Sequence, residues 1–444
     1  MKQTIQLSDH FTYGKLARFT IPSIVMMIFT SIYGVVDGIF VSNYVGKTAF
    51  AAVNLIMPFL MIFGALGFMI GTGGSALISK TMGEGKREKA NELFSMLILL
   101  SAAAAAVLTV LGIALMRPVA ILLGAEGAMV EDCVVYGRIL MVTLVPFILQ
   151  NEFQSFCVAA ERPRLGLAVT VAAGLTNMVL DALFVAVFRW GIVGAAWATS
   201  ISQLVGGVIP FVYFLLPNSS ALRLRRFRFD GRALFRSCTN GSSELVSNLS
   251  MSLVNMLYNF QLMRVAGEDG VAAYGVIMYV NFIFVGVFLG YSFGVAPVVS
   301  YHYGAGNEGE LKSLFRKSLT IIALCAAVLT AAAEGLAGPL SGIFVSYDAG
   351  LYEMTRRGFM IYSASFLFMG FNMFGSSFFT ALNDGLVSAL ISFLRAFLFQ
   401  VGAILVLPAL LGIDGVWLAV VTAELLALTV TVTCLVKNKK KYQY

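Results

Sequence analysis

Charged residues are scarce in this sequence of 444 residues. They make up 12% of the chain, whereas hydrophobic residues make up 59% and the mean hydropathy is +0.87. Soluble domains average about 25% charged residues, so this composition excludes an ordinary water-soluble globular protein. It predicts an all-α integral membrane protein, because a helix satisfies its own backbone hydrogen bonds within lipid.

Histidine and regularly spaced cysteine are lacking as well. His10 and His302 are the two histidines, and the five cysteines are scattered without the spacing of a metal or disulfide framework. The sequence therefore excludes a histidine-based metal centre, and we expect no cofactor. The first 18 residues are polar and precede a full-length apolar run, so we expect an uncleaved membrane span rather than a secretory signal.

Apolar runs long enough to cross a hydrocarbon core of roughly 30 Å occur twelve times. The first six runs cover residues 17–42, 49–78, 92–116, 133–159, 165–188 and 191–216. The second six runs cover residues 240–264, 271–301, 313–336, 356–382, 387–408 and 413–436. The linkers between them are mostly short and carry Gly, Pro or charge, so the sequence predicts twelve transmembrane helices.

Lysine and arginine are distributed unevenly over these linkers. If both termini and alternate linkers share one side, that side holds 22 of the 30 Lys and Arg residues and the other side holds seven. The positive-inside rule then predicts a multi-pass protein of the cell membrane, the plasma or bacterial inner membrane, with both termini in the cytoplasm. The net charge of +7 is explained by linkers that lie near anionic lipids. We therefore expect membrane lipids as partners and no nucleic acid.

The two halves of the chain repeat each other at a shift of 221 residues. Ile56-Met57 falls on Ile277-Met278, "GEG" (83–85) falls on "GAG" (304–306), and "GIVGAAWA" (191–198) falls on "GIDGVWLA" (412–419). The shift covers an even number of spans, so both halves have the same orientation, as in many secondary transporters. The sequence predicts a six-helix lobe in residues 1–218, a basic cytoplasmic linker in 219–238 and a second six-helix lobe in 239–444.

Polar residues inside the spans need a partner or a wet cavity. Asp37 lies in the first span, and Asn177 and Asp181 share one face of the fifth span because they are four residues apart. The fourth and sixth spans add further polar side chains: Gln150, Asn151, Glu152 and Thr199. Asp37, Asn151 and Asp181 lie at similar depths in their spans, so we expect these three residues to meet in one pocket.

The repeat provides an internal control for the acidic residues. At the same shift Asp37 falls on Tyr258, and Asp181 falls on Gly402. The fold therefore does not require the two carboxyl groups, which indicates a function confined to the first half. Carboxylate and amide oxygens at Asp37, Asn177 and Asp181 suit Na⁺, whereas two buried carboxyl groups also suit a proton that binds and leaves. The sequence leaves this choice open.

The second half offers a different set of polar and aromatic residues. Aromatic rings and Met side chains form adaptable binding walls, and ring faces attract cations. The residues expected to line a substrate cleft are Gln150, Glu244, Tyr258, Asn259, Tyr274, Met278, Asn281 and Arg395. The stretch "GTGGSA" (71–76) lies inside an apolar span, so we expect close helix packing there rather than a phosphate loop.

Several stretches occur in the same order as in one known family. They include "IPSIVMMIFTSIYGVVDGIFVSNYVG" (21–46), "MGEGKREKA" (82–90), "LTNMVLDALFV" (175–185), "GIVGAAWAT" (191–199) and "SFLRAFLFQVGAILVLP" (392–408). With the six-plus-six repeat, they make nearly the whole chain similar to the multidrug and toxic compound extrusion (MATE) transporters, DinF-like branch.

The resemblance implies a multidrug efflux antiporter rather than an enzyme. Such a protein has two six-helix lobes around a V-shaped central cleft, and it expels amphipathic or cationic organic compounds in exchange for H⁺ or Na⁺. In the branch with a first-lobe cation site, the site residues match Asp37, Asn151, Asn177, Asp181 and Thr199. Glu152 is an extra carboxyl group beside this set. Pro22 matches a proline where the first span bends in some members, so a gating role is implied. We also expect the protein to be a monomer.

Two turns depart from the family pattern. "VAAERP" (158–163) has Glu161 where the family has Gly, and "ALNDG" (381–385) ends in Gly385 where the family has Pro. Both turns are expected at the cytoplasmic side, so they put closure of the inner gate in doubt more than ion binding.

Two other functions remain as alternatives. A lipid-linked saccharide or lipid flippase of the same superfamily tends to have several cationic residues in its cleft, whereas Arg395 is the one candidate here. A membrane-embedded transferase needs a catalytic carboxylate or His near a loop, and the short loops disfavour it. The natural substrate is not predicted by the sequence.

Overall fold

The first half of the chain folds into helices joined by short turns. The computed structural model describes residues 5–444, so the predicted cytoplasmic charge of Lys2 lies outside the described residues. The helices of this half, the first lobe, are α1 (Tyr13–Tyr44), α2 (Lys47–Gly83), α3 (Arg87–Leu122), α4 (Ala128–Val142), α5 (Leu144–Ala159), α6 (Pro163–Asp181), the π-helix η1 (Ala182–Val187) and α7 (Gly191–Leu215).

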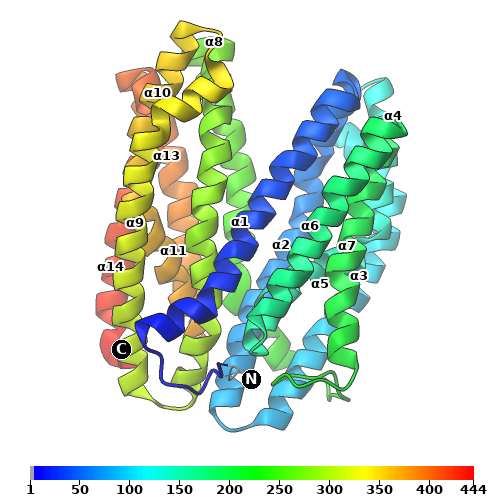
Figure 1. Ribbon diagram of the computed structural model, residues 1–444. Helices are drawn as coiled ribbons and strands as arrows, with labels where there is room; N and C mark the ends of the chain where they lie inside the picture. Colours follow the sequence, from blue (N-terminus) through cyan, green and yellow to red (C-terminus); the bar gives the residue numbers. More distant parts are fainter. Residues whose placement is uncertain (1–4) are drawn as a thin grey trace.

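The second half repeats this build, and Figure 1 shows the two groups of helices diverging from the end that carries both termini. Its helices, the second lobe, are α8 (Gly231–Gly304), α9 (Glu308–Val345), α10 (Ala349–Ser363), α11 (Phe366–Ala381), α12 (Gly385–Phe393), the π-helix η2 (Leu394–Leu398), α13 (Phe399–Leu411) and α14 (Ile413–Tyr442). α8 begins at Gly231, inside the segment 219–238 that the sequence predicts as a linker, because an N-cap bond to the Asp230 side chain starts the helix early.

The helices of the two lobes make twelve membrane crossings. α8 has 74 residues, which is about 110 Å at 1.5 Å per residue and far too long for one crossing. It divides at Gly267, whose φ of 65° and ψ of −151° favour glycine, into two crossings. The pairs α4–α5 and α10–α11 bend by 61° and 47° but each forms one crossing. The predicted twelve transmembrane helices in two lobes are therefore confirmed within residues 5–444.

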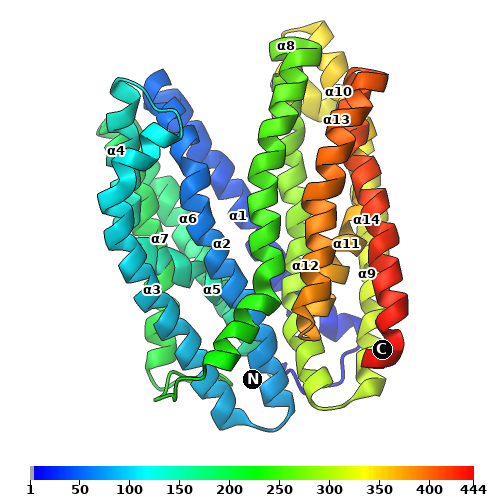
Figure 2. The same cartoon turned by 180° about the vertical axis from the view of Figure 1, so that it is seen from behind.

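Small residues bring the lobes together near the end that carries the termini. A Cβ atom added at Gly73 would lie 2.0 Å from the Ser237 carbonyl oxygen, and one at Gly241 would lie 1.8 Å from the Met69 carbonyl oxygen. α2 and the first half of α8 therefore touch backbone to backbone along this stretch (Figure 2). The expectation that "GTGGSA" serves close helix packing is confirmed.

The same contact recurs between the other two helices of the repeat. α1 passes diagonally from the second lobe to the first (Figure 1), and it packs against the second half of α8. A Cβ atom added at Gly290 would lie 2.4 Å from the Ile24 Cα, and one at Gly294 would lie 3.1 Å from the Thr20 Cα. At the shift of 221, Gly73 corresponds to Gly294 and Thr20 to Gly241, so one pseudo-symmetric pair of contacts holds the lobes at this end.

The segment before α1 adds a strap across the same end. The Leu7 N–H donates to the Glu161 carboxylate of the first lobe (2.8 Å), and the Phe11 N–H donates to the Glu310 carboxylate of the second lobe (2.8 Å). His10 pairs with the same Glu310 through Nδ1 (2.6 Å). Leu7 and Phe11 are fully buried. The strap therefore links the two lobes through both backbone and side-chain contacts.

Glu161 departs from the family glycine, and the structure shows what it does instead. Its φ of 61° lies in the left-handed region, which costs a non-glycine residue about 1–2 kcal/mol. Its carboxylate gains the Leu7 hydrogen bond, and its partial burial raises its pKa above the usual range while Leu7 and Arg87 oppose that shift. The lobes meet at this end with Glu161 in place, and the effect of the substitution on closure stays a prediction.

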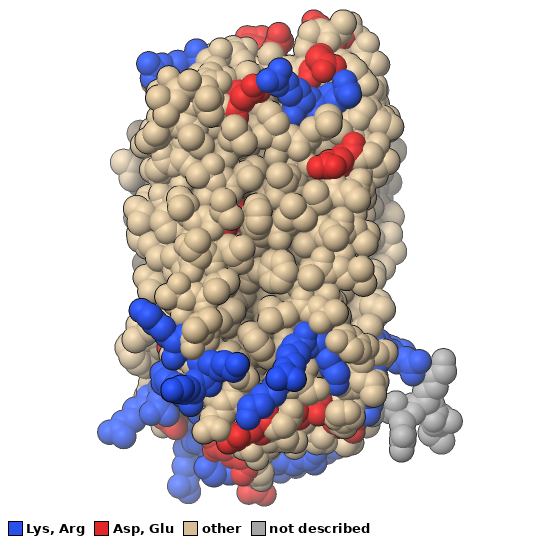
Figure 3. Space-filling view, turned by 90° about the vertical axis from the view of Figure 1, so that its left-hand side faces the viewer, with Lys and Arg blue, Asp and Glu red and all other residues tan. Residues whose placement is uncertain are grey.

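Charged side chains gather at the two ends of the molecule. Figure 3 shows a broad band of uncharged atoms between them on the face in view, with most of that face's Lys and Arg at the lower end. Many apolar side chains are exposed in the described part of the chain, for example Val110, Leu253 and Ile343. Exposed apolar surface of this kind is stable in lipid rather than in water, and the protein is therefore an integral membrane protein.

Candidate functional site

The carboxyl groups of Asp37 and Asp181 face each other inside the first lobe. α1 supplies Asp37, and Asp181 is the last residue of α6, where the π-helix η1 begins. Asn177, one helical turn before Asp181, turns its amide to the Asp37 carboxyl group. Asp181 is fully buried and Asn177 is 2% exposed. The structure therefore brings these three predicted residues together.

Hydroxyl groups complete this cluster, which we call the acidic site. Tyr33 and Tyr136 lie close enough to Asp37 for an electrostatic interaction with its carboxyl group. Thr199 lies beside the Tyr136 hydroxyl. Gln150, which the sequence assigned to the substrate cleft, faces Tyr33 instead. The sequence analysis missed both tyrosines; Tyr33 lies four residues before Asp37, a spacing that indicates a shared helix face.

Several oxygen atoms of the acidic site are buried without a hydrogen-bond partner among the described residues. They are Asp37 Oδ1, Tyr136 Oη, Gln150 Oε1, Asp181 Oδ1, Asp181 Oδ2 and Thr199 Oγ1. Unpartnered buried oxygens cost about 1–3 kcal/mol each, and two facing carboxylates repel each other. A bound cation or a proton between them relieves both costs. The oxygen donors fit either species, as the sequence predicts.

Asn151 and Glu152 point elsewhere. The Asn151 amide lies against α2, where its Nδ2 donates to the Gly64 carbonyl oxygen at 3.5 Å. Glu152 is fully buried and turns toward Ser101 of α3 and Cys238 of α8. Adjacent residues of a helix point about 100° apart, so Glu152 cannot share the direction of its neighbour. The contacts within residues 5–444 bring neither residue to Asp37.

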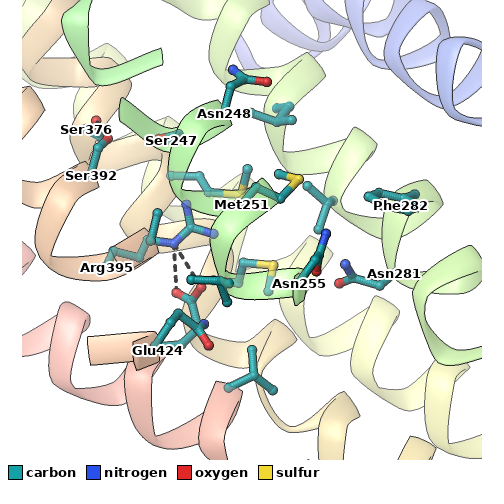
Figure 4. Close-up of a pocket in the computed structure, with 18 of the residues that line it drawn as sticks. Ser247, Asn248, Met251, Asn255, Asn281, Phe282, Ser376, Ser392, Arg395 and Glu424 are labelled. Atoms are coloured by element: carbon teal, nitrogen blue, oxygen red, sulfur yellow. Dashed lines mark hydrogen bonds and ion pairs between the residues drawn. The ribbon is translucent and has the colours of Figure 1, made fainter. Parts of the chain in front are cut away.

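The second lobe contains a pocket of about 190 Å³, shown in Figure 4. Pockets that bind drug-sized ligands have volumes of about 300–1,000 Å³, so this pocket admits one end of such a molecule. The predicted residues that line it are Glu244, Tyr258, Tyr274, Met278, Asn281 and Arg395. Ser247, Asn248, Met251, Asn255, Tyr362, Gln400 and Glu424 line it as well.

Asn259 is the predicted cleft residue of the second lobe that does not line this pocket, and its place in a cleft between the lobes stays a prediction. Asn259 is exposed on α8, outside the residues that line the pocket. Asn255 and Tyr258 occupy the pocket face of the helix. Asn259 is rotated by about 100° from Tyr258 and by about 40° from Asn255, so it lies at the edge of this face.

Aromatic and amide groups fill the position that corresponds to the acidic site. Tyr258, the counterpart of Asp37, donates its hydroxyl hydrogen bond to Gln400 Oε1 (2.8 Å) and stacks on Tyr274 with ring centroids 5.3 Å apart. Tyr274 in turn donates to Asn255 Oδ1 (2.9 Å). These partners satisfy the polar groups, so the second lobe packs without a carboxyl pair at this place.

An ion pair lies at one wall of the pocket. Arg395, in η2, donates from Nε to Glu424 Oε1 at 2.9 Å and to Oε2 at 3.0 Å. Asn372 donates to the same carboxylate (2.8 Å), and Thr431 donates to Asn372 Oδ1 (2.9 Å). Glu424 is 1% exposed. This pairing joins residues 29 positions apart in the chain, so spacing alone does not predict it.

Pro22 lies within α1, which continues from Tyr13 to Tyr44 through it. Proline removes a backbone hydrogen bond and favours a kink, and Pro22 is buried in α1 near the crossing with α8. Its place is compatible with the gating role that the resemblance implies, and that role stays a prediction.

The comparisons with known proteins agree with this architecture. A model of the family described as MatE matches residues 22–183 and 245–405, one stretch in each half. The multidrug export protein MepA of Staphylococcus aureus (strain NCTC 8325 / PS 47) is 22% identical over 419 residues, which are 94% of this chain and 92% of the relative.

Solved structures match the whole chain. One described as MATE in complex with MaL6 gives a TM-score of 0.93 at 22% identity and covers 100% of both chains. Another, the outward-facing conformation of a multidrug resistance MATE family transporter of the MOP superfamily, gives 0.93 at 23% identity over 100% of this chain and 99% of that one. At this identity the likeness shows the fold.

Proposed function

The chain belongs to the MatE family, and on that premise we propose that it is a secondary antiporter that exports amphipathic, drug-like compounds in exchange for H⁺ or Na⁺. The name of the staphylococcal relative, a multidrug export protein, supports the direction and substrate class. The observation that carries the coupling is the acidic site, with its two facing carboxyl groups in one lobe. We further propose that both termini lie in the cytoplasm.

The acidic site can act as a switch because its two carboxyl groups come from different helices. Asp37 is on α1 and Asp181 is on α6, so a cation or proton between them favours the conformation in which these helices approach. The coupling requires a different affinity in the two conformations, since a ligand with equal affinity shifts nothing.

α1 also connects the acidic site with the second-lobe pocket. Ser31, six residues before Asp37, donates to the Phe282 carbonyl oxygen at 3.1 Å, and Phe282 lines the pocket. Gly286 and Gly290 of α8 lie against Met27 and Ile24 of α1. A shift of α1 therefore changes the wall of the pocket directly, which supplies a contiguous route between the ion and the substrate.

The single guanidinium group disfavours the flippase alternative. Among the described residues that line the pocket, Arg395 is the one cation, and Glu424 already pairs with it. A pyrophosphate-linked lipid carries several negative charges, which call for several cations. Drug-like compounds with one charged group suit this pocket better.

Uptake of a fluorescent cation into proteoliposomes tests the proposal. We expect a pH or a Na⁺ gradient to drive rhodamine 6G uptake by the wild type, and we expect Asp181→Asn to abolish it. Glu126→Gln is the matched control, because Glu126 is an exposed carboxyl group in the turn between α3 and α4. Uptake that neither gradient drives would contradict the antiport, and equal uptake by Asp181→Asn would contradict the acidic site.

A further inference from the structure

The guanidinium group of Arg395 uses Nε for its ion pair, and its two terminal nitrogens, Nη1 and Nη2, take no part in that pair. Within residues 5–444, its hydrogen bonds to Glu424 come from Nε, and neither Nη1 nor Nη2 has a partner. The terminal nitrogens point away from Glu424 in Figure 4, on the side of the pocket residues Asn248 and Met251. The side chain is 16% exposed, although it lies within a membrane crossing.

Glu424 fixes the orientation of this group. Its two oxygen atoms both accept from Nε, and Asn372 holds the carboxylate from the other side. The π-helix η2 widens the turn that carries Arg395, and such turns occur frequently at functional sites. A guanidinium held in this way keeps two parallel N–H donors, which match the two oxygens of a carboxylate.

The pocket also contains a carboxylate without an ion-pair partner. Glu244 lines it and makes no salt bridge within the described part of the chain. Arg395 and Glu424 neutralise each other, so the pocket presents a donor fork for one anion, and Glu244 adds a second carboxyl group to its lining. Tyr258 and Tyr274, which stack on each other, supply aromatic faces to the same pocket.

We propose that Arg395 binds a carboxylate of the transported compound through Nη1 and Nη2, so that the pocket selects amphipathic zwitterions over purely cationic compounds. This inference rests on the proposed function and names the substrate class of its second-lobe pocket. The pocket is too small for a whole drug molecule, so the carboxylate end enters it and the apolar remainder extends toward Phe282 and Phe293, which contact the first lobe.

The repeat supports a specific role for this arginine. At the shift of 221, Arg395 corresponds to Gly174 and Glu424 to Gln203. Gly174 packs against Phe29 and Tyr33, and Gln203 accepts a hydrogen bond from Thr143 (2.9 Å). The first lobe packs this place with uncharged groups, so the fold does not require an ion pair there.

A matched pair of dyes tests the proposal. Rhodamine 19 has a free carboxylate, and rhodamine 6G is its ethyl ester with the same cationic ring system. Fluorescence anisotropy on purified protein gives the ratio of the two dissociation constants. We expect the wild type to bind the free acid about tenfold more tightly, or by about 1.4 kcal/mol, because hydrogen bonds between charged groups add affinity.

Variants of the ion pair then locate the preference. The double variant Arg395→Gln/Glu424→Gln removes both charges together, so that no buried carboxylate is left unpaired. We expect its ratio to fall to about one. Arg395→Lys keeps the charge on Glu424 but lacks the fork, so we expect an intermediate ratio. Arg357→Gln is the control, since Arg357 pairs with Asp414 outside the pocket, and its ratio should equal that of the wild type.

The outcomes separate this proposal from the proposed function. A wild-type ratio near one, or a ratio that the double variant leaves unchanged, overturns the role of Arg395. A purely structural ion pair would weaken the binding of both dyes in parallel and leave the ratio alone, which also overturns it. Failure of gradient-driven transport for both dyes would instead refute the antiporter, whatever the binding ratio.

Discussion

The two lobes share one backbone plan but carry different charges at corresponding places. The first lobe has Asp37 and Asp181, where the second has Tyr258 and Gly402; the second has the Arg395–Glu424 pair, where the first has neutral residues. Both lobes interrupt the corresponding crossing with a π-helical turn at the charged residue, η1 after Asp181 and η2 around Arg395. The difference indicates that the repeat supplies the frame and that each lobe has its own chemical task.

The contacts between the lobes provide the first test of this comparison. Gly241 has no room for a side chain, whereas its counterpart Thr20 already carries one against Gly294. We expect Gly241→Ala to lower rhodamine 6G efflux from cells by about tenfold or more, since overpacking costs about 1–3 kcal/mol. Gly294→Ala should have a smaller effect, because its added Cβ atom would lie 3.1 Å from Thr20.

Gly275 is the control for these two variants. A Cβ atom added there meets no described atom within 4 Å, so Gly275→Ala should export the dye at the wild-type rate. Fluorescence of a C-terminal tag checks that each variant reaches the membrane in equal amount. Equal efflux by Gly241→Ala and Gly275→Ala would show that close contact at this end is not needed.

The second test moves the carboxyl group of Asp37 to the corresponding position in the second lobe, Tyr258. We expect Tyr258→Asp to leave the Asp37→Asn variant at the background rate of dye uptake in proteoliposomes. The new carboxyl group would lack a partner, because the counterpart of Asp181 is Gly402. Rescue of gradient-driven uptake by the double variant would contradict a coupling site confined to the first lobe.

The third test concerns a single hydroxyl group. Thr199 lies beside Tyr136 in the acidic site, and its counterpart is Val420. We expect Thr199→Val to raise the ion concentration for half-maximal uptake by about two- to tenfold, the worth of one hydrogen bond. Val420→Thr serves as the control and should leave that concentration unchanged. Equal effects of the two substitutions would argue against an ion-contacting role of the Thr199 hydroxyl.

The smallest effect concerns the turn after α11, outside the membrane. Burial alone would raise the pKa of Asp384, but Tyr442 and Lys441 outweigh it and hold the pKa below its usual value of 3.8. A lowered folded-state pKa means that the stabilisation is present above pH 3.8 and is lost as the pH falls through the folded value.

We therefore expect Asp384→Asn, which removes the charge that pairs with Lys441, to lower the Tm at pH 7 by about 1–2 °C. Glu308→Gln, at an exposed pair with Lys312, should change the Tm less. A larger shift for Glu308→Gln would contradict the contribution assigned to Asp384.

Hydropathy and the repeat predicted the helical frame well, because lipid forces every crossing into a helix and apolar length marks each one. The same reasoning placed Asp37, Asn177 and Asp181 together, since two of them share a helix face and the third is the costly residue of its span. The sequence could not predict how each helix is rotated about its own axis, so it did not decide which of two adjacent residues faces a pocket. Asn259 therefore lies outside the residues that line the second-lobe pocket.

Pairings between distant residues were also beyond the sequence. Tyr136 enters the acidic site from α4, and the Arg395–Glu424 pair joins two crossings of the second lobe. Such contacts depend on how the helices are rotated and packed, and one sequence contains no direct signal of that. The missed residues are accordingly those whose partners lie on other helices.

The most direct test of the central claim, that the lobes divide ion coupling and substrate binding, compares two measurements on one variant. Asp37→Asn protein is assayed for rhodamine 6G binding by anisotropy and for uptake of the dye driven by a pH or a Na⁺ gradient. We predict a dissociation constant close to that of the wild type and uptake at the background rate. Driven uptake at the wild-type rate, or binding lost as steeply as uptake, would contradict the division of tasks.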